Sequence, residues 1–64
     1  MSTDFYIHNL EKDCISYREL VTMFPGKYDS FKSGLLLGKV FTLYALDLID
    51  PGTYSYLCDL VSLK

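Results

Sequence analysis

The longest apolar segment of this chain, residues 29–49, constrains its fold more than any other feature. A polar residue that can cap a helix, Asp29 or Ser30, precedes it, and a helix-breaking Asp-Pro-Gly run follows it. The other segments are too short to be stable without a larger surface to pack against. The sequence therefore predicts an all-α fold of three or four short helices, packed around a central apolar helix over residues 30–48.

This central helix does not have the sequence of a membrane span. Lys39 and Asp47 interrupt it, whereas a span needs about 20 consecutive, mostly apolar residues. With 64 residues, the chain is long enough for one small domain, residues 1–64. We therefore expect a core helix in a single domain and no membrane partner.

The composition is too apolar for the size of the core. Half of the residues are hydrophobic, and ten are Phe or Tyr. A chain of this length buries only about 60% of the surface that its unfolded form exposes. Some aromatic side chains must therefore lie at the surface, where contiguous apolar patches mark interaction sites. This excess predicts a protein partner, a homodimer, or both.

Charge and cysteine content argue against several other classes. The net charge is −2, whereas nucleic-acid-binding proteins carry basic faces that contact phosphate, so nucleic acid is disfavoured as a partner. The first residues lack the basic and apolar regions of a signal peptide. We therefore expect a cytoplasmic protein in which Cys14 and Cys58 are reduced and act as small hydrophobic residues, with a disulfide between them as the alternative.

The N-terminal segment, residues 1–14, carries no decisive pattern. Residues 4–10 fit either a short strand or a helical turn capped by Ser2 or Thr3. We favour the helix, because the sequence offers no second strand to pair with and a lone strand is not stable. The charged residues 11–13 indicate a solvated loop.

A helix start is predicted at Ser16. Ser16 and Glu19 have the spacing of a capping box, in which each side chain accepts a hydrogen bond from the other residue's backbone N–H. Pro25 and Gly26 end this helix within two turns. One of its faces is apolar and predicted to be buried: Tyr17, Leu20, Val21 and Phe24.

Two glycines lie four residues apart inside the central helix, Gly34 and Gly38, and Thr42 continues their ridge. Each glycine in a helix interior costs about 1 kcal/mol relative to alanine, so the pair indicates a neighbour packed close to the backbone. That neighbour is either another helix of the chain or a second subunit. The remaining ridges are apolar and predicted to be largely buried: Phe31, Leu35, Leu36, Leu37, Val40, Phe41, Leu43 and Tyr44.

The last helix is predicted to begin at Asp50 and Pro51, because Asp caps helices and Pro fits the first helical position. Thr53 is the alternative cap. The connection is short, so we expect a helical hairpin at the C-terminus. Two apolar stripes follow, one formed by Tyr54, Leu57, Cys58 and Val61 and the other by Tyr56, Leu60 and Leu63.

No residues in the sequence have the arrangement of an active site. His8, the only histidine, lies six residues before Cys14, and no third group orients the pair. Two cysteines and one histidine are too few for a four-ligand zinc site. We therefore predict no enzyme activity, no catalytic residue, no metal and no cofactor, with a Cys/His-dependent enzyme as one alternative.

Tyrosines are the best candidates for contact residues, because tyrosine is enriched where one end of a side chain is dry and the other is wet. Tyr28 in a turn and Tyr56 off the main stripe are predicted to be exposed. The complete predicted partner or dimer interface is Tyr28, Gly34, Gly38, Thr42, Tyr56 and Leu60.

In its small size, acidic charge and aromatic surface, the chain is similar in kind to the accessory proteins with which phages and plasmids block a host enzyme or defence complex. That resemblance implies a non-enzymatic protein-binding module, an inhibitor or modulator that occupies a partner's surface. The alternative is a small helix-turn-helix-like, transcription-associated regulator. That reading is disfavoured because Lys32 and Lys39 are the only basic residues of the second helix.

Overall fold

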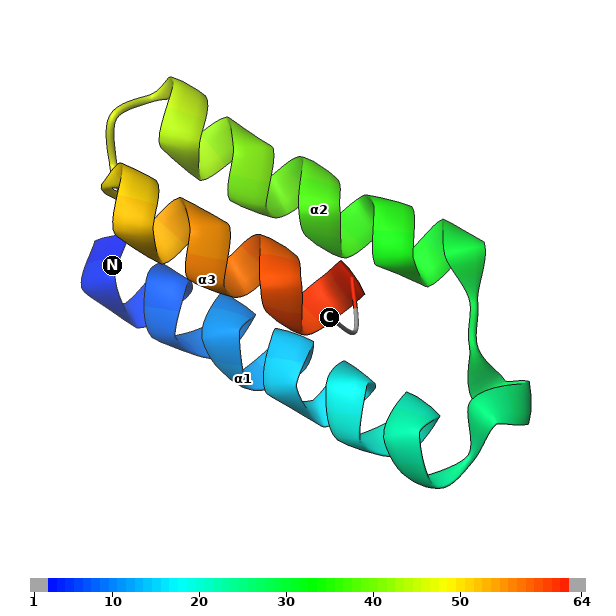
Figure 1. Ribbon diagram of the computed structural model, residues 1–64. Helices are drawn as coiled ribbons and strands as arrows, with labels where there is room; N and C mark the ends of the chain where they lie inside the picture. The colour runs from blue at the N-terminus through cyan, green and yellow to red at the C-terminus, as the bar shows by residue number, and fades with distance from the viewer. Residues whose placement is uncertain (1–2, 63–64) are drawn as a thin grey trace.

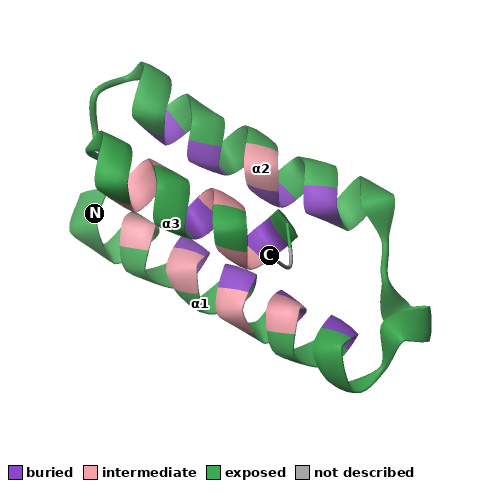
Figure 2. Cartoon of the chain, in the orientation of Figure 1, coloured by how far each residue is buried: buried purple, intermediate pink, exposed green. Residues whose placement is uncertain are grey.

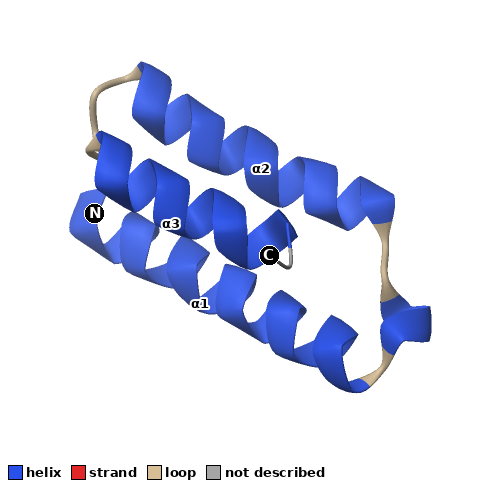
Figure 3. Ribbon diagram, in the orientation of Figure 1, coloured by secondary structure: helices blue, strands red, loops and turns tan. Residues whose placement is uncertain are grey.

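The computed structural model describes residues 3–62, which are helical apart from short connections (Figure 1) (Figure 3). The elements are α1 (Thr3–Met23), the 3-10 turn η1 (Pro25–Lys27), α2 (Ser30–Ala45) and α3 (Pro51–Ser62). No strand occurs within residues 3–62. The predicted all-α class is therefore confirmed.

Helix α1 is one continuous helix of 21 residues. Residues 4–10 are helical, as we favoured, but residues 11–13 are not a loop and Ser16 lies in the helix interior instead of at a cap. The reason is a buried stripe at helical spacing that runs through the charged residues: Leu10, Cys14, Tyr17 and Val21. Ser2, the alternative first cap, lies outside the described residues.

Two predicted helix starts are confirmed. The Asp29 carboxylate accepts hydrogen bonds from the backbone N–H groups of Phe31 and Lys32, at 3.0 and 3.3 Å, and α2 begins directly after it. The Asp50 carboxylate accepts from the N–H of Thr53 at 2.7 Å, and α3 follows. These bonds occupy N–H groups that the first helical turn leaves without partners.

Helix α2 ends at Ala45, three residues earlier than predicted. Asp47 adopts a left-handed backbone conformation with φ of 61°. The N–H groups of Asp47 and Leu48 then return to the carbonyls of Tyr44 and Leu43, at 3.0 and 2.9 Å. This pair of bonds is a Schellman motif, which terminates a helix by satisfying its last carbonyls.

Helix α3 lies between α1 and α2 and packs against both more extensively than they pack against each other (Figure 1). The prediction that residues 30–48 form the central element is therefore not confirmed. On one side of α3, the Tyr54 ring stacks on Tyr44 of α2 with centroids 4.4 Å apart. On the other side, the Asp59 carbonyl accepts a hydrogen bond from the Arg18 guanidinium of α1 at 3.1 Å.

All three helices and the α2–α3 connection contribute to one core, and Figure 2 shows its members on the sides where the helices face one another. The buried hydrophobic residues are Leu10, Cys14, Tyr17, Val21, Leu36, Val40, Leu43, Ile49, Leu57 and Val61. Leu63, predicted to share a stripe with Tyr56 and Leu60, lies outside the described residues. None of the helices in residues 3–62 combines the length and apolar character needed to cross a bilayer.

Candidate protein-interaction surface

Large apolar side chains remain exposed on every helix, as the composition predicted. Among residues 3–62, thirteen are exposed: Phe5, Tyr6, Leu20, Met23, Phe24, Tyr28, Phe31, Leu35, Phe41, Tyr44, Leu46, Leu48 and Tyr56. Scattered exposed apolar residues are ordinary in a soluble protein, whereas contiguous groups mark interaction sites. The grouping of these thirteen therefore matters more than their number.

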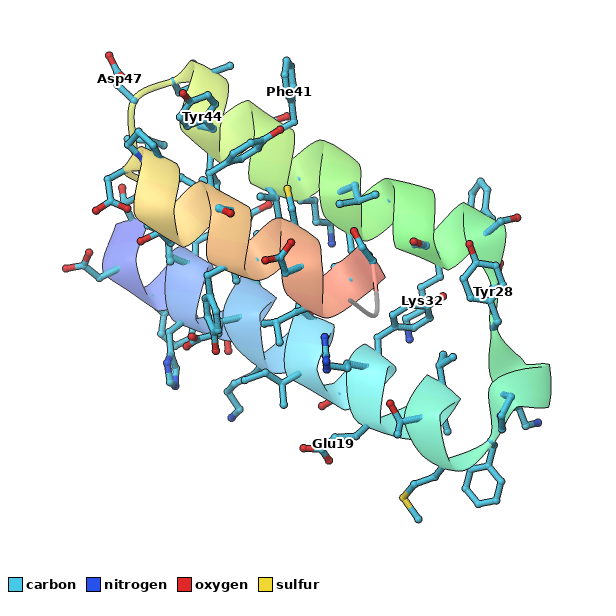
Figure 4. The ribbon with its side chains drawn as sticks, viewed as in Figure 1. Glu19, Tyr28, Lys32, Phe41, Tyr44 and Asp47 are labelled. Carbon is cyan, nitrogen blue, oxygen red and sulfur yellow. The ribbon has the colours of Figure 1, made fainter. Side chains whose placement is uncertain are left out.

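One contiguous group covers the side of α2 that points away from the core. Its seven members follow helical spacing along the whole helix, and we call them the outer face of α2: Phe31, Gly34, Leu35, Gly38, Phe41, Thr42 and Ala45. All seven are exposed and none is charged. Phe31, Phe41 and Leu35 expose 74%, 60% and 52% of their surface. Figure 4 shows Phe41 projecting away from the other helices.

The two glycines of the outer face have open space above them. A Cβ atom placed on Gly34 or Gly38 would meet no heavy atom within 4 Å. The interpretation in which another helix of this chain crosses close to them is therefore wrong, because α1 and α3 lie on the opposite side of α2. The Thr42 hydroxyl donates to the Gly38 carbonyl at 2.9 Å, so it needs no partner from outside the helix.

A second exposed group surrounds η1, where the chain passes from α1 to α2. We call it the η1 corner, and it consists of Leu20, Met23, Phe24 and Tyr28. Tyr28 is exposed as predicted, and Figure 4 shows it at the end of the molecule close to the start of α2. Leu20 and Phe24 were expected in the core. They are exposed because the buried stripe of α1 passes through Tyr17 and Val21 instead.

An open hollow of about 330 Å³ lies between the start of α1 and the end of α2. Its lining is mostly apolar and consists of Thr3, Tyr6, Lys39, Thr42, Leu43, Leu46 and Leu48. Thr42 joins this hollow to the outer face of α2. The hollow therefore extends the apolar surface and is too open to enclose a small ligand.

The six predicted interface residues do not form one surface. Gly34, Gly38 and Thr42 share the outer face of α2, and Tyr28 lies at the η1 corner. Tyr56 is exposed on α3 beside α1, where partial desolvation and a hydrogen bond to the Glu11 carboxylate raise its pKa. Leu60 is half-buried against the core.

The residues of the alternative Cys/His site are not brought together. Cys14 is fully buried, and burial, with the nearby Asp13 charge, raises the pKa of its thiol to about 11. His8 is exposed on the same helix, six residues away, and so points in a different direction. A nucleophilic thiol needs a lowered pKa and an adjacent base. No group of three His, Cys, Asp or Glu side chains suited to a metal occurs within residues 3–62.

Phe31, Leu35 and Phe41 are surface residues that the sequence pattern did not reveal, because every large apolar ridge of α2 was expected in the core. One signal could have separated them: they lie on the same side of the helix as the two glycines, whereas Leu36, Val40 and Leu43 lie opposite.

Comparison with protein-family models, curated proteins and solved structures gives no significant match.

Proposed function

We propose that this chain is a small, non-enzymatic protein-binding module that works by occupying the surface of a partner protein, as an inhibitor or modulator in the cytoplasm. The observation that carries the proposal is the contiguous set of exposed apolar side chains on the outer face of α2, together with the further exposed apolar side chains of the η1 corner. Such groups are typical of protein contacts. In this proposal, α2 and the following α3 act as a helical hairpin that holds the outer face as one apolar surface.

The η1 corner is the proposed site for the partner. Met23, Phe24 and Tyr28 expose 71%, 54% and 55% of their surface within a short stretch of chain. Aromatic residues and methionine are enriched at the centres of protein interfaces, where burial of a few large side chains supplies most of the affinity. The net charge of −2 supports a protein over a nucleic acid as the partner.

The helix-turn-helix alternative has less support. The outer face of α2 carries seven uncharged residues, whereas a recognition helix offers polar side chains to base edges and cations to phosphates. Its two lysines lie off this face, and the Lys32 ammonium is placed over the Tyr17 ring, 5.7 Å from the centroid. Retention of the chain on immobilised DNA at low salt would favour this alternative.

The test is affinity purification of the tagged chain from its native host, with identification of the proteins that co-purify. The comparison uses Tyr28→Asp at the η1 corner and Ser16→Asp on the exposed side of α1. Both substitutions add one negative charge to an exposed residue. We expect a partner that is retained by the wild type and by Ser16→Asp but lost with Tyr28→Asp. Absence of any partner, or equal retention by both variants, would contradict the proposal.

A further inference from the structure

The outer face of α2 has a property that the η1 corner lacks: it is one helical stripe centred on Gly38, with large and small side chains at corresponding distances on the two sides of that residue. Gly38 lies at the middle of the seven, with Phe31 seven residues before it and Ala45 seven residues after it. Leu35 and Phe41 lie three residues away on either side, and Gly34 and Thr42 lie four residues away. A surface with this arrangement can match a second copy of itself.

We propose that the outer face of α2 is the contact between two copies of this chain, which pack antiparallel about a two-fold axis at Gly38. This inference deepens the proposed function and rests on it, because it assigns one of the two apolar groups to self-association and leaves the η1 corner for the partner. A two-fold contact joins the same patch on both subunits, so each residue must face its complement across the axis.

The antiparallel arrangement places large side chains opposite small residues. Phe31 of one copy lies at the same height as Ala45 of the other, and the two Gly38 residues meet on the axis. Phe41 and Gly34 share one edge of the face, so each Phe41 lies over a Gly34. Leu35 and Thr42 share the opposite edge and pair in the same way. Packing of large against small residues lets helices approach closely.

The area of the outer face is sufficient for a weak dimer. From the exposed fractions of Phe31, Phe41 and Leu35, together with the smaller residues between them, the face offers roughly 500 Å² per copy. Two copies would bury at most about 1,000 Å², which is less than a stable complex buries and is typical of a weak, transient interface. Helix α2 has 16 residues and is about 24 Å long, so the face extends along its whole length. We therefore expect a weak, reversible dimer.

Sedimentation velocity over a wide range of concentrations, with Gly38→Leu as the critical variant, tests this inference. The monomer has room for the new side chain at Gly38, and leucine favours a helix more than glycine does, so the variant should fold. Ser16→Leu adds the same side chain to an exposed position on α1. We expect the wild type and Ser16→Leu to dimerise with similar dissociation constants. The dissociation constant of the Gly38→Leu dimer should be at least about tenfold higher.

Cysteine cross-linking tests the register. Two Gly38→Cys chains would place their new thiols on the two-fold axis, within the Cα separation of about 4.4–6.8 Å that a disulfide requires. A mixture of Phe31→Cys and Ala45→Cys chains should form the mixed dimer faster than either self-linked dimer. Ser16→Cys is the control, since Ser16 is exposed on α1, away from the outer face. Cross-linking of Gly38→Cys no faster than Ser16→Cys would overturn the inference.

The outcomes separate this inference from the proposed function. A wild-type chain that stays monomeric at all concentrations, or a Gly38→Leu chain that dimerises normally, would overturn the dimer and leave partner binding through the η1 corner intact. The dimer would also be overturned if the captured partner protected the outer face of α2. The same holds if a monomeric chain inserted this face into lipid vesicles. A wild-type chain that dimerises but captures no partner, or a partner retained equally by Tyr28→Asp and Ser16→Asp, would contradict only the proposed function.

Discussion

At the residue scale, Tyr17 connects α1 to the start of α2. Its ring is fully buried, and its hydroxyl donates to the Asp29 carbonyl at 3.1 Å and accepts from the Asp29 N–H at 3.2 Å. The Lys32 ammonium lies 5.7 Å from the ring centroid, where a cation is attracted to the aromatic face. One side chain therefore fixes the capping residue of α2 and the entry of that helix into the bundle.

We expect Tyr17→Phe to destabilise the fold by about 1–2 kcal/mol, because the ring still fits while the Asp29 N–H loses its partner and the Asp29 carbonyl keeps only the Ser33 N–H. Urea unfolding followed by circular dichroism measures the change. Tyr28→Phe is the matched control, since Tyr28 is exposed and the same hydroxyl is removed at the surface. Equal unfolding midpoints for the two variants would show that the buried hydroxyl does not stabilise the fold.

Cys14 gives the fold a dependence on alkaline pH. Burial, followed by the Asp13 charge, raises the pKa of its thiol from 9.0 to about 11. Between these values, the unfolded chain loses the thiol proton while the folded chain retains it, so stability falls as pH rises from 9 towards 11. We expect the urea midpoint of the wild type to fall more steeply across this window than that of Cys14→Ala. Parallel slopes would contradict this. The two proteins differ only at residue 14, so the difference in slope belongs to the Cys14 thiol.

At the element scale, capping residues in the sequence predicted where α2 and α3 begin, but they did not predict that α1 continues without a break through Ser16. Asp29 and Asp50 each precede a helix and cap it, because a carboxylate there binds free N–H groups whatever the tertiary structure. The Ser16–Glu19 pair has the same local pattern but lies inside α1. A capping box stabilises a start only where the chain before it is not helical. The buried stripe from Leu10 onward keeps the chain before Ser16 helical, and only packing against α3 reveals that.

Alanine substitution at Asp29 and at Ser16 compares how much each residue contributes to stability as a helix cap. Asp29→Ala should cost about 1 kcal/mol, because it removes the cap of α2. Ser16→Ala should be neutral or stabilise by up to about 0.5 kcal/mol, because alanine is the better helix former at an exposed interior position. Thermal unfolding by calorimetry measures both. A loss of about 1 kcal/mol at Ser16 would indicate that α1 begins there after all.

The end of α2 contains a residue in a conformation that favours glycine. Asp47 has φ of 61°, a left-handed conformation in which a side chain is strained and glycine is not. We expect Asp47→Gly to raise the free energy of unfolding by about 0.5–1 kcal/mol. Asp59→Gly, on the exposed side of α3, should lower it by about 1 kcal/mol. Chemical denaturation distinguishes these opposite signs, and destabilisation by both would contradict the left-handed turn.

At the scale of the whole molecule, the sequence predicted that apolar side chains would remain exposed, Tyr28 and Tyr56 among them, but not which ridge of α2 would be exposed. Ten residues form the core and thirteen large apolar side chains stay exposed within residues 3–62. Helix α2 is apolar on nearly every side, so its sequence alone does not select a buried ridge. The choice depends on α3 lying between the other helices, which places Leu36, Val40 and Leu43 inside and Phe31 and Phe41 outside.

If two copies pair through the outer face of α2, stability must depend on protein concentration. A dimer that binds the folded chain shifts the unfolding equilibrium by mass action. We expect the melting temperature of the wild type to rise with concentration, and that of Gly38→Leu to stay constant. Because glycine costs about 1 kcal/mol in a helix, the Gly38→Leu monomer should melt higher than the wild type at the lowest concentration. A concentration-independent wild type would contradict pairing.

The position of α3 also has a consequence for biosynthesis. Both α1 and α2 rest mainly on a helix that begins only at Pro51. A nascent chain in which α3 is still inside the ribosome has α1 and α2 without the helix that covers most of their inward faces. We therefore expect cotranslational folding to stall until α3 emerges, and any ribosome-bound intermediate to be a substrate for chaperones during that interval.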